Sequence, residues 1–171
     1  MTLEEAIKTA IVYEKKVHGA YAGAAKQATD PTAAKVFEVM ASEEQGHVAY
    51  LESRLGEWQK TGQVVAEKLG TILPSKEKVQ AGVKKLKGTL KKPASGATPE
   101  LGFLQQALIL EEETSAFYRR MVAELPPAGQ QLFARFLEIE EGHGVIVQAE
   151  IDSVTGAGFW FDVMEFSLEG G

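Results

Sequence analysis

Two tetrapeptides of the form Glu-x-x-His carry the residue types of a metal site. They are Glu44-Gln45-Gly46-His47 and Glu140-Glu141-Gly142-His143. A glutamate and a histidine three residues apart lie on the same face of an α-helix, so one metal ion can bind both side chains. The two motifs use two of the three histidines in the chain.

Each motif is preceded by a glutamate and a tyrosine at matched spacing. Glu14 and Tyr21 come before the first motif, and Glu111 and Tyr118 lie 97 positions further along. The two Glu-x-x-His motifs are themselves 96 positions apart. The chain therefore contains an internal repeat that keeps its ligand-type residues. Four carboxylates and two imidazoles in two matched sets predict a dinuclear metal site.

The segments that carry these residues have the apolar spacing and end signals of four long helices. The first opens at a capping box, Thr2-Leu3-Glu4-Glu5, and should stop near Thr29. The second starts at Asp30-Pro31 and fades before Gly62, and the third opens at Thr98-Pro99. The fourth follows Pro126-Pro127 and continues to about Gly156. The pattern predicts two helical hairpins.

The distance of each glutamate from its turn indicates whether the ligands can meet. Glu14 lies 16 residues before Asp30 and Glu44 lies 14 after it, while Glu111 and Glu140 lie 15 before and 14 after Pro126. At about 1.5 Å rise per residue, each carboxylate is roughly 21–24 Å from its turn. All four therefore stand at one height in the hairpins.

The predicted organisation is one bundle over residues 1–156, with a crossover at about 60–98, and an aromatic tail at 157–171. The crossover contains an amphipathic, lysine-rich stretch with the apolar stripe Val79, Val83, Leu86 and Leu90, followed by a loop at 91–96. Its lysines form either a solvated face or a docking patch for an acidic electron carrier. The tail should pack on the bundle or on a partner subunit, which favours a homodimer.

Composition limits the function. The chain has no cysteine, which excludes disulfides, thiolate zinc sites and iron–sulfur clusters. The net charge is −6, and residues 76–92 alone hold seven lysines, so the remaining acidic body is not expected to bind nucleic acid. The first residues do not resemble a signal peptide, and no apolar run would span a membrane. We expect a cytoplasmic protein.

Four glutamates facing one another inside a bundle repel strongly, and removing them from water adds several kcal/mol per ion. Two divalent cations would offset this charge. Iron, manganese and zinc all accept glutamate and histidine ligands.

This pattern resembles the rubrerythrins of the ferritin-like di-iron carboxylate superfamily, over about residues 2–58 and 99–153. The resemblance implies an all-α, ferritin-like four-helix bundle, with a long crossover between the second and third long helices. It also implies two iron ions, with Glu44 and Glu140 as bridging carboxylates. The implied metal ligands are Glu14, Glu44, His47, Glu111, Glu140 and His143. Tyr21 and Tyr118 would orient ligand carboxylates or serve as plain core residues.

The activity that this resemblance implies is reduction of hydrogen peroxide to water. Rubrerythrins typically carry a C-terminal rubredoxin domain with four cysteines, which this chain lacks, so electrons should come from a separate, rubredoxin-like donor. Rubrerythrins also place an extra glutamate where this chain has Thr114.

Three other functions remain open at this stage. They are a ferroxidase or iron-binding protein that uses O₂, a non-catalytic module that holds zinc or manganese, and an oxygenase acting on an organic substrate. Of the remaining polar residues, Glu43, Glu112, Glu113 and Glu141 are expected to be solvated neighbours. His18 is expected at the surface or supporting a ligand.

Overall fold

The computed structural model describes residues 1–65, 69–87 and 98–156. Within them lie five helices: α1 (Leu3–Gln27), α2 (Pro31–Thr61), α3 (Lys76–Lys87), α4 (Pro99–Glu124) and α5 (Pro127–Gly156). No strand occurs in these ranges, which confirms the predicted all-α class. None of the described helices is both long enough and apolar enough to cross a membrane.

The helix ends follow the local signals in the sequence. The Thr2 hydroxyl accepts from the Glu5 N–H while the Glu5 carboxylate accepts from the Thr2 N–H, which completes the predicted capping box. Asp30 accepts from two N–H groups at the start of α2. Gly62 ends α2 at φ 68°, a left-handed conformation that glycine adopts at little cost. The first helix ends at Gln27, two residues before the predicted Thr29.

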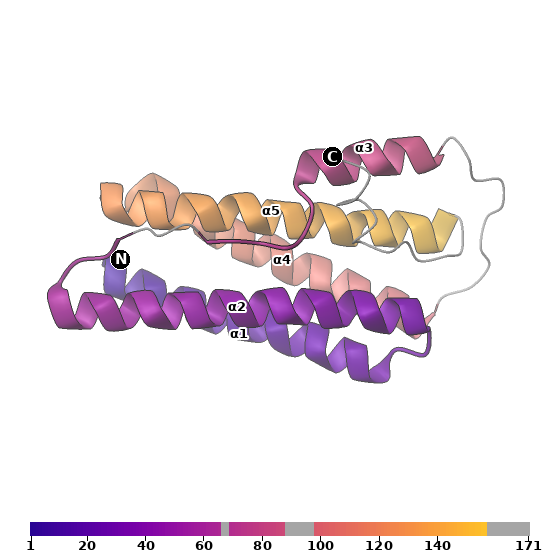
Figure 1. Cartoon of the computed structure of the whole chain (residues 1–171), viewed down its shortest axis with the longest axis horizontal. Coiled ribbons are helices and arrows are strands. Elements are labelled where there is room, and N and C mark those ends of the chain that lie inside the picture. The colour runs from indigo at the N-terminus through magenta and orange to yellow at the C-terminus, as the bar shows by residue number, and fades with distance from the viewer. Residues whose placement is uncertain (66–68, 88–97, 157–171) are drawn as a thin grey trace.

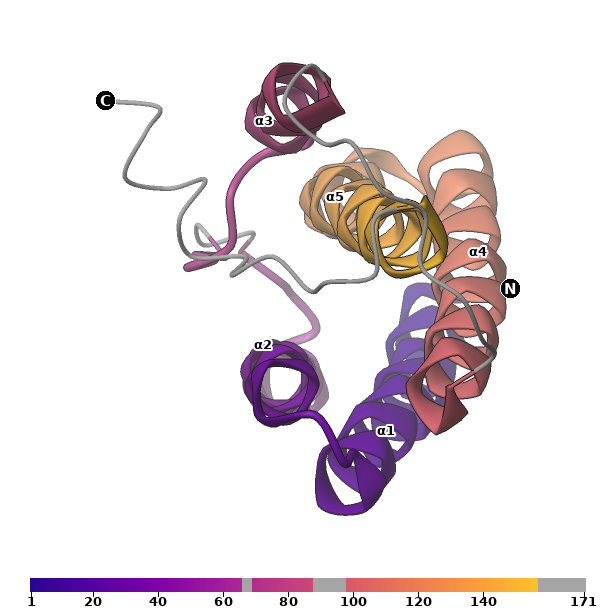
Figure 2. The same ribbon diagram turned by 90° about the vertical axis from the view of Figure 1, so that its right-hand side faces the viewer.

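The four long helices form the ferritin-like bundle that the sequence predicted. α1 pairs with α2 and α4 pairs with α5, and the two hairpins pack together mainly through α1 and α4 (Figures 1 and 2). The crossover from α2 runs between α2 and α5 and then turns into α3, which packs on the outside of α5 (Figures 1 and 2). Residues 69–87 of the crossover therefore cover the side of the bundle where α2 faces α5.

The amphipathic stretch of the crossover forms α3. Val79 is fully buried and Val83 packs against the core, as the predicted stripe requires. The side chain of Leu86, together with Leu90, the loop at 91–96 and the aromatic tail at 157–171, lies outside the described residues. The predicted domain limits and the docking of the tail therefore stay predictions.

Two apolar clusters occupy opposite halves of the bundle. One surrounds Phe37 and Met40 near the α1–α2 turn. The other contains Phe117, Phe133 and Phe136 near the α4–α5 turn. Burial of this apolar surface holds the four helices together and fixes the polar residues between the clusters.

A buried glutamate near the start of α4 ties the two hairpins together. Glu100 Oε1 accepts hydrogen bonds from the Thr29 N–H (2.7 Å), the Thr29 hydroxyl (2.7 Å) and the Asp30 N–H (3.3 Å). Burial opposes the charged carboxylate, but these hydrogen bonds outweigh it and lower the pKa of Glu100 to about 2. No local sequence pattern predicted this contact.

We expect Glu100→Gln to lower the free energy of unfolding by about 1–3 kcal/mol at pH 7, because hydrogen bonds to a charged group are lost. The folded-state pKa is depressed, so this contribution is complete above pH 4.5 and disappears as the pH falls towards 2. Urea unfolding at pH 7 and at pH 3 measures both effects, with the exposed Glu112→Gln as the control. An equal loss at both pH values would contradict the charged hydrogen bonds.

Candidate metal centre

The six predicted ligands converge between the two apolar clusters. Glu14 comes from α1, the first Glu-x-x-His from α2, Glu111 from α4 and the second Glu-x-x-His from α5. Each of the six side chains is at most 1% exposed. Charged and imidazole groups are rarely buried this completely unless they are paired or bind a metal. The equal heights that the sequence predicted are consistent with this meeting point.

The six residues form two overlapping groups in which ligand atoms lie within 4.8 Å of one another. One group is Glu14, Glu44, His47 and Glu140, and the other is Glu44, Glu111, Glu140 and His143. Each group could hold a metal ion. Glu44 and Glu140 belong to both groups, which is the position that a bridging carboxylate requires. Their assignment as bridging ligands stays a prediction.

The two histidines face the carboxylates through Nδ1. His47 Nδ1 lies 3.2 Å from Glu14 Oε2, 3.3 Å from Glu44 Oε2 and 3.1 Å from Glu140 Oε1. His143 Nδ1 lies 2.8 Å from Glu44 Oε1 and 3.8 Å from Glu111 Oε1. The imidazole rings are nearly parallel, at 4°, with centroids 5.4 Å apart. The histidines therefore present equivalent nitrogens to one shared set of oxygens.

Several of these polar atoms have no partner. Among the described residues, Glu111 Oε2, Glu140 Oε2, His47 Nε2 and His143 Nε2 have neither a hydrogen bond nor an ion-pair contact. Burying such atoms unpaired is costly, and native proteins avoid it unless another group supplies the missing interaction. Oxygen and imidazole donors suit divalent first-row metals. The residues present thus fit two divalent cations.

Without a cation, the carboxylates disturb one another's protonation. Burial and the charge of Glu44 raise the pKa of Glu14 to about 8, and burial and the charges of Glu14 and Glu44 raise that of Glu140 to about 7. Burial alone would lower the pKa of His143, but the neighbouring carboxylates raise it to about 9. Metal ions must therefore displace protons to bind here.

The two predicted tyrosines connect the hairpins at the metal centre. The Tyr21 hydroxyl on α1 donates to Glu111 on α4, and the Tyr118 hydroxyl on α4 donates to Glu14 on α1. Burial, together with the charge of the carboxylate that each one faces, raises both tyrosine pKa values well above the ordinary value, so the hydroxyls keep their protons. Each hairpin thus orients the lone glutamate of the other.

We expect Tyr118→Phe to weaken metal binding about 10- to 100-fold, because Glu14 loses the hydrogen bond that fixes its carboxylate. The symmetry of the contacts predicts a similar effect for Tyr21→Phe at Glu111. Calorimetric titration with Mn²⁺ measures the affinities. Tyr13→Phe is a suitable control, because Tyr13 is stacked on Phe117 and is outside both metal-binding groups. Wild-type affinity in both variants would leave the tyrosines as plain core residues.

The other polar residues near the motifs differ in their exposure and in their bonding partners. Glu112 and Glu113 are exposed, as predicted. Glu141 is half-buried and pairs with Arg119 at 2.9 Å. His18 is partly buried with Nδ1 2.8 Å from the Ala41 carbonyl oxygen, and it is outside the metal-binding groups.

Two further residues bear on the site. Thr114 is fully buried, and its hydroxyl donates to the Leu110 carbonyl within α4. Glu43, expected to be solvated, is instead half-buried and bonded to the crossover. Its counterpart in the repeat is Ile139, so the repeat carried no signal for this role.

Comparison with known proteins identifies a family for this chain. The family model described as Rubrerythrin matches residues 1–93, which include α1, α2, α3 and the first Glu-x-x-His. No curated protein and no solved structure matches the chain.

Proposed function

The chain belongs to the rubrerythrin family, and from this premise we propose that it is a di-iron oxidoreductase that reduces hydrogen peroxide to water. The observation that carries the proposal is the pair of buried ligand groups sharing Glu44 and Glu140. Two adjacent metal positions with common carboxylates suit the two-electron reduction of one small oxidant.

Each ligand has a specific place in this proposal. Glu14 and His47 would complete the position nearer the first hairpin, and Glu111 and His143 the position nearer the second, with Glu44 and Glu140 between them. Two ferrous ions held in this way supply, when bound, the two electrons that cleave the O–O bond. Four glutamates balance the charge of two such ions.

The protein's own residues prepare the site for this reaction. The tyrosine hydroxyls hold Glu14 and Glu111 in place, which limits reorganisation of the ligands. Phe136 packs edge-on against His47 and keeps that side apolar. Reduction of one peroxide to two waters consumes two electrons and two protons. In this proposal the electrons come from a separate donor protein.

The donor would bind at α3, the lysine-rich helix of the crossover. Lys76, Lys78 and Lys84 lie on this helix, which packs on α5. Opposite charge on an acidic partner would accelerate the encounter.

A second candidate is oxidation of iron by O₂, with iron as the substrate. The observation in its favour is Thr114, which occupies the position of the extra glutamate in the family resemblance and bonds its own helix instead. A site without that carboxylate lacks one ligand that the resemblance associates with peroxide reduction.

Anaerobic loading with two Fe²⁺ per chain, followed by stopped-flow mixing with H₂O₂ or with O₂, tests these functions. Oxidation at least about tenfold faster with peroxide is expected, together with repeated turnover under an added reductant. Faster oxidation by O₂, with many irons consumed per chain, would replace the proposal with the ferroxidase. Failure to bind two irons would overturn both.

A further inference from the structure

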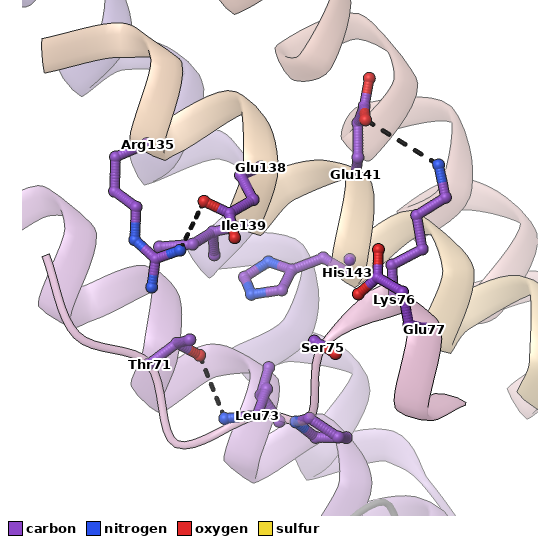
Figure 3. A pocket seen from close by; sticks show the side chains of 12 residues that line it. Thr71, Leu73, Ser75, Lys76, Glu77, Arg135, Glu138, Ile139, Glu141 and His143 are labelled. Carbon is purple, nitrogen blue, oxygen red and sulfur yellow. Dashed lines mark hydrogen bonds and ion pairs between the residues drawn. The ribbon is translucent and has the colours of Figure 1, made fainter. Parts of the chain in front are cut away.

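A pocket of about 290 Å³ lies between the crossover and α5 and reaches the metal centre. Crossover residues from Thr71 to Glu77 line one side, and α5 residues from Arg135 to His143 line the other. Figure 3 shows the His143 ring pointing into this pocket from α5. His143 is 1% exposed, its Nδ1 faces Glu44 at 2.8 Å, and its Nε2 has no hydrogen-bond partner among the described residues. The pocket thus ends at a buried side chain that is suited to bind a metal ion.

Glu43 extends the set of ligand-type residues beyond the six already described. It forms a group with His47 and His143 in which one ligand atom from each lies within 4.8 Å of the others. One carboxylate and two imidazoles make a suitable donor set for a single divalent ion. Unlike the six buried ligands, Glu43 is half-buried and borders the crossover.

The present partners of Glu43 are both on the crossover. Its Oε2 accepts from the Thr71 hydroxyl at 2.5 Å, and its Oε1 accepts from the Ile72 N–H at 3.2 Å. Thr71 also lines the pocket. The carboxylate therefore stands between the pocket wall and the two histidines, within reach of both.

We propose that the pocket is the entry route for divalent metal ions, and that Glu43, with His47 and His143, holds each incoming ion before it reaches the four buried glutamates. The inference rests on the proposed function only in assuming that the six ligands bind two ions. An entering ion draws the Glu43 carboxylate away from Thr71 and Ile72. The ion then moves inwards to the stronger field of the four carboxylates, and Glu43 returns to the crossover.

A second pocket, of about 410 Å³, is lined by Glu111 and Glu140, but the repeat supplies no second carboxylate at the position of Glu43. The counterpart of Glu43 in the second hairpin is Ile139, an apolar residue that is 5% exposed and lines the first pocket. The carboxylate that would hold an incoming ion is therefore present on α2 as Glu43, whereas the equivalent position on α5 is the apolar Ile139. Glu43 therefore breaks the symmetry of the repeat. The six-ligand site, which is symmetric, does not need Glu43 as a ligand, so a role in metal entry accounts for its position.

Uptake of Co²⁺ by the metal-free protein tests this role through the visible absorbance of the bound ion, without any turnover. We expect Glu43→Gln to slow uptake at least about tenfold, because an amide is a poor ligand, while two Co²⁺ still bind at equilibrium. Thr71→Val should load at least as fast as the wild type, since it frees the carboxylate. Glu141→Gln is the matched control, because it removes one carboxylate charge from the pocket wall and Glu141 is outside the Glu43 group. This variant should load at the wild-type rate.

An uptake rate in Glu43→Gln equal to that of the wild type would overturn the inference. Equal slowing in Glu141→Gln would also overturn it, because the loss of any nearby negative charge would then explain the slower uptake. A drop to one bound Co²⁺ in Glu43→Gln would also overturn it, because Glu43 would then be a permanent ligand. If the wild type itself binds fewer than two Co²⁺, the proposed function fails rather than the entry route.

Discussion

Replacing both Glu44 and Glu140 by glutamine is expected to remove both metal ions, whereas Glu14→Gln should remove only one. The reason is geometric, because Glu44 and Glu140 belong to both ligand groups and Glu14 belongs to one. Glutamine preserves side-chain volume, so packing between the apolar clusters should survive. Loss of a single supporting contact typically costs 10- to 100-fold in metal affinity, and loss of two direct ligands per ion should exceed about 100-fold.

Metal analysis of the purified variants after anaerobic Fe²⁺ loading and gel filtration measures the stoichiometry directly. We expect two irons per chain in the wild type, one in Glu14→Gln and fewer than 0.5 in the double variant, on the order of what a more than 100-fold weaker site retains. Glu138→Gln is the control, since Glu138 is an exposed α5 glutamate paired with Arg135. Two retained irons in the double variant would show that the carboxylates do not bridge.

The second large effect is that the metal-free protein should lose stability as the pH rises, and that bound metal should reverse this trend. The pKa of Glu14 is raised from 4.5 to about 8 and that of Glu140 to about 7, chiefly by burial. For these groups the folded state binds more protons than the unfolded state, so stability falls between pH 4.5 and 8. The pKa of His143 is raised from 6.5 to about 9 by its carboxylate neighbours, and its contribution is also lost as the pH rises.

Glu44 titrates in the opposite sense but outside this window. Burial alone would raise its pKa, but the charges of His143 and His47 hold it well below 4.5. Its stabilising contribution is therefore already complete above pH 4.5. Between pH 5 and 8.5, the shifted cluster residues should together destabilise the metal-free protein by several kcal/mol, since one pKa unit corresponds to about 1.4 kcal/mol.

Thermal unfolding followed by circular dichroism measures this effect in chelator and in Mn²⁺ from pH 5 to 8.5. We expect the Tm in chelator to fall by roughly 10–20 °C, because about 1 kcal/mol shifts the Tm of a domain of this size by 2–4 °C. Stabilisation by Mn²⁺ should grow with pH, because protons compete less with the metal. Glu14→Gln with Glu111→Gln should flatten the curve in chelator, because burial and the charge of Glu140 also raise the pKa of Glu111 well above 4.5. A Tm in chelator that rises with pH would contradict the buried carboxylate cluster.

The fold followed closely from local signals. Capping residues at Thr2 and Asp30 marked helix starts, and Gly62 marked a helix end. These signals act within one turn of backbone, so they can be recognised without knowing how the helices pack. Periodic apolar residues then fixed which helix faces turn inwards. The side-chain partners of the crossover could not be predicted in the same way. They depend on which polar groups of the packed hairpins still lack hydrogen-bond partners, and this is known only once the helices are in place.

By itself, the sequence determined the four long helices, the internal repeat and the six ligand-type residues at one height. An α-helix has a fixed rise per residue and 3.6 residues per turn, so the spacing of two residues sets their relative height and face on the helix. The heights and faces of the ligand-type residues can therefore be predicted from the sequence. Only the tertiary structure decided how the helices of one hairpin pack against those of the other. It brought Tyr21 to Glu111 and Tyr118 to Glu14, placed Glu44 and Glu140 in both ligand groups, and turned Glu43 towards the crossover. These contacts join residues far apart in the chain, and they arise from the packing of apolar faces, which no local spacing encodes.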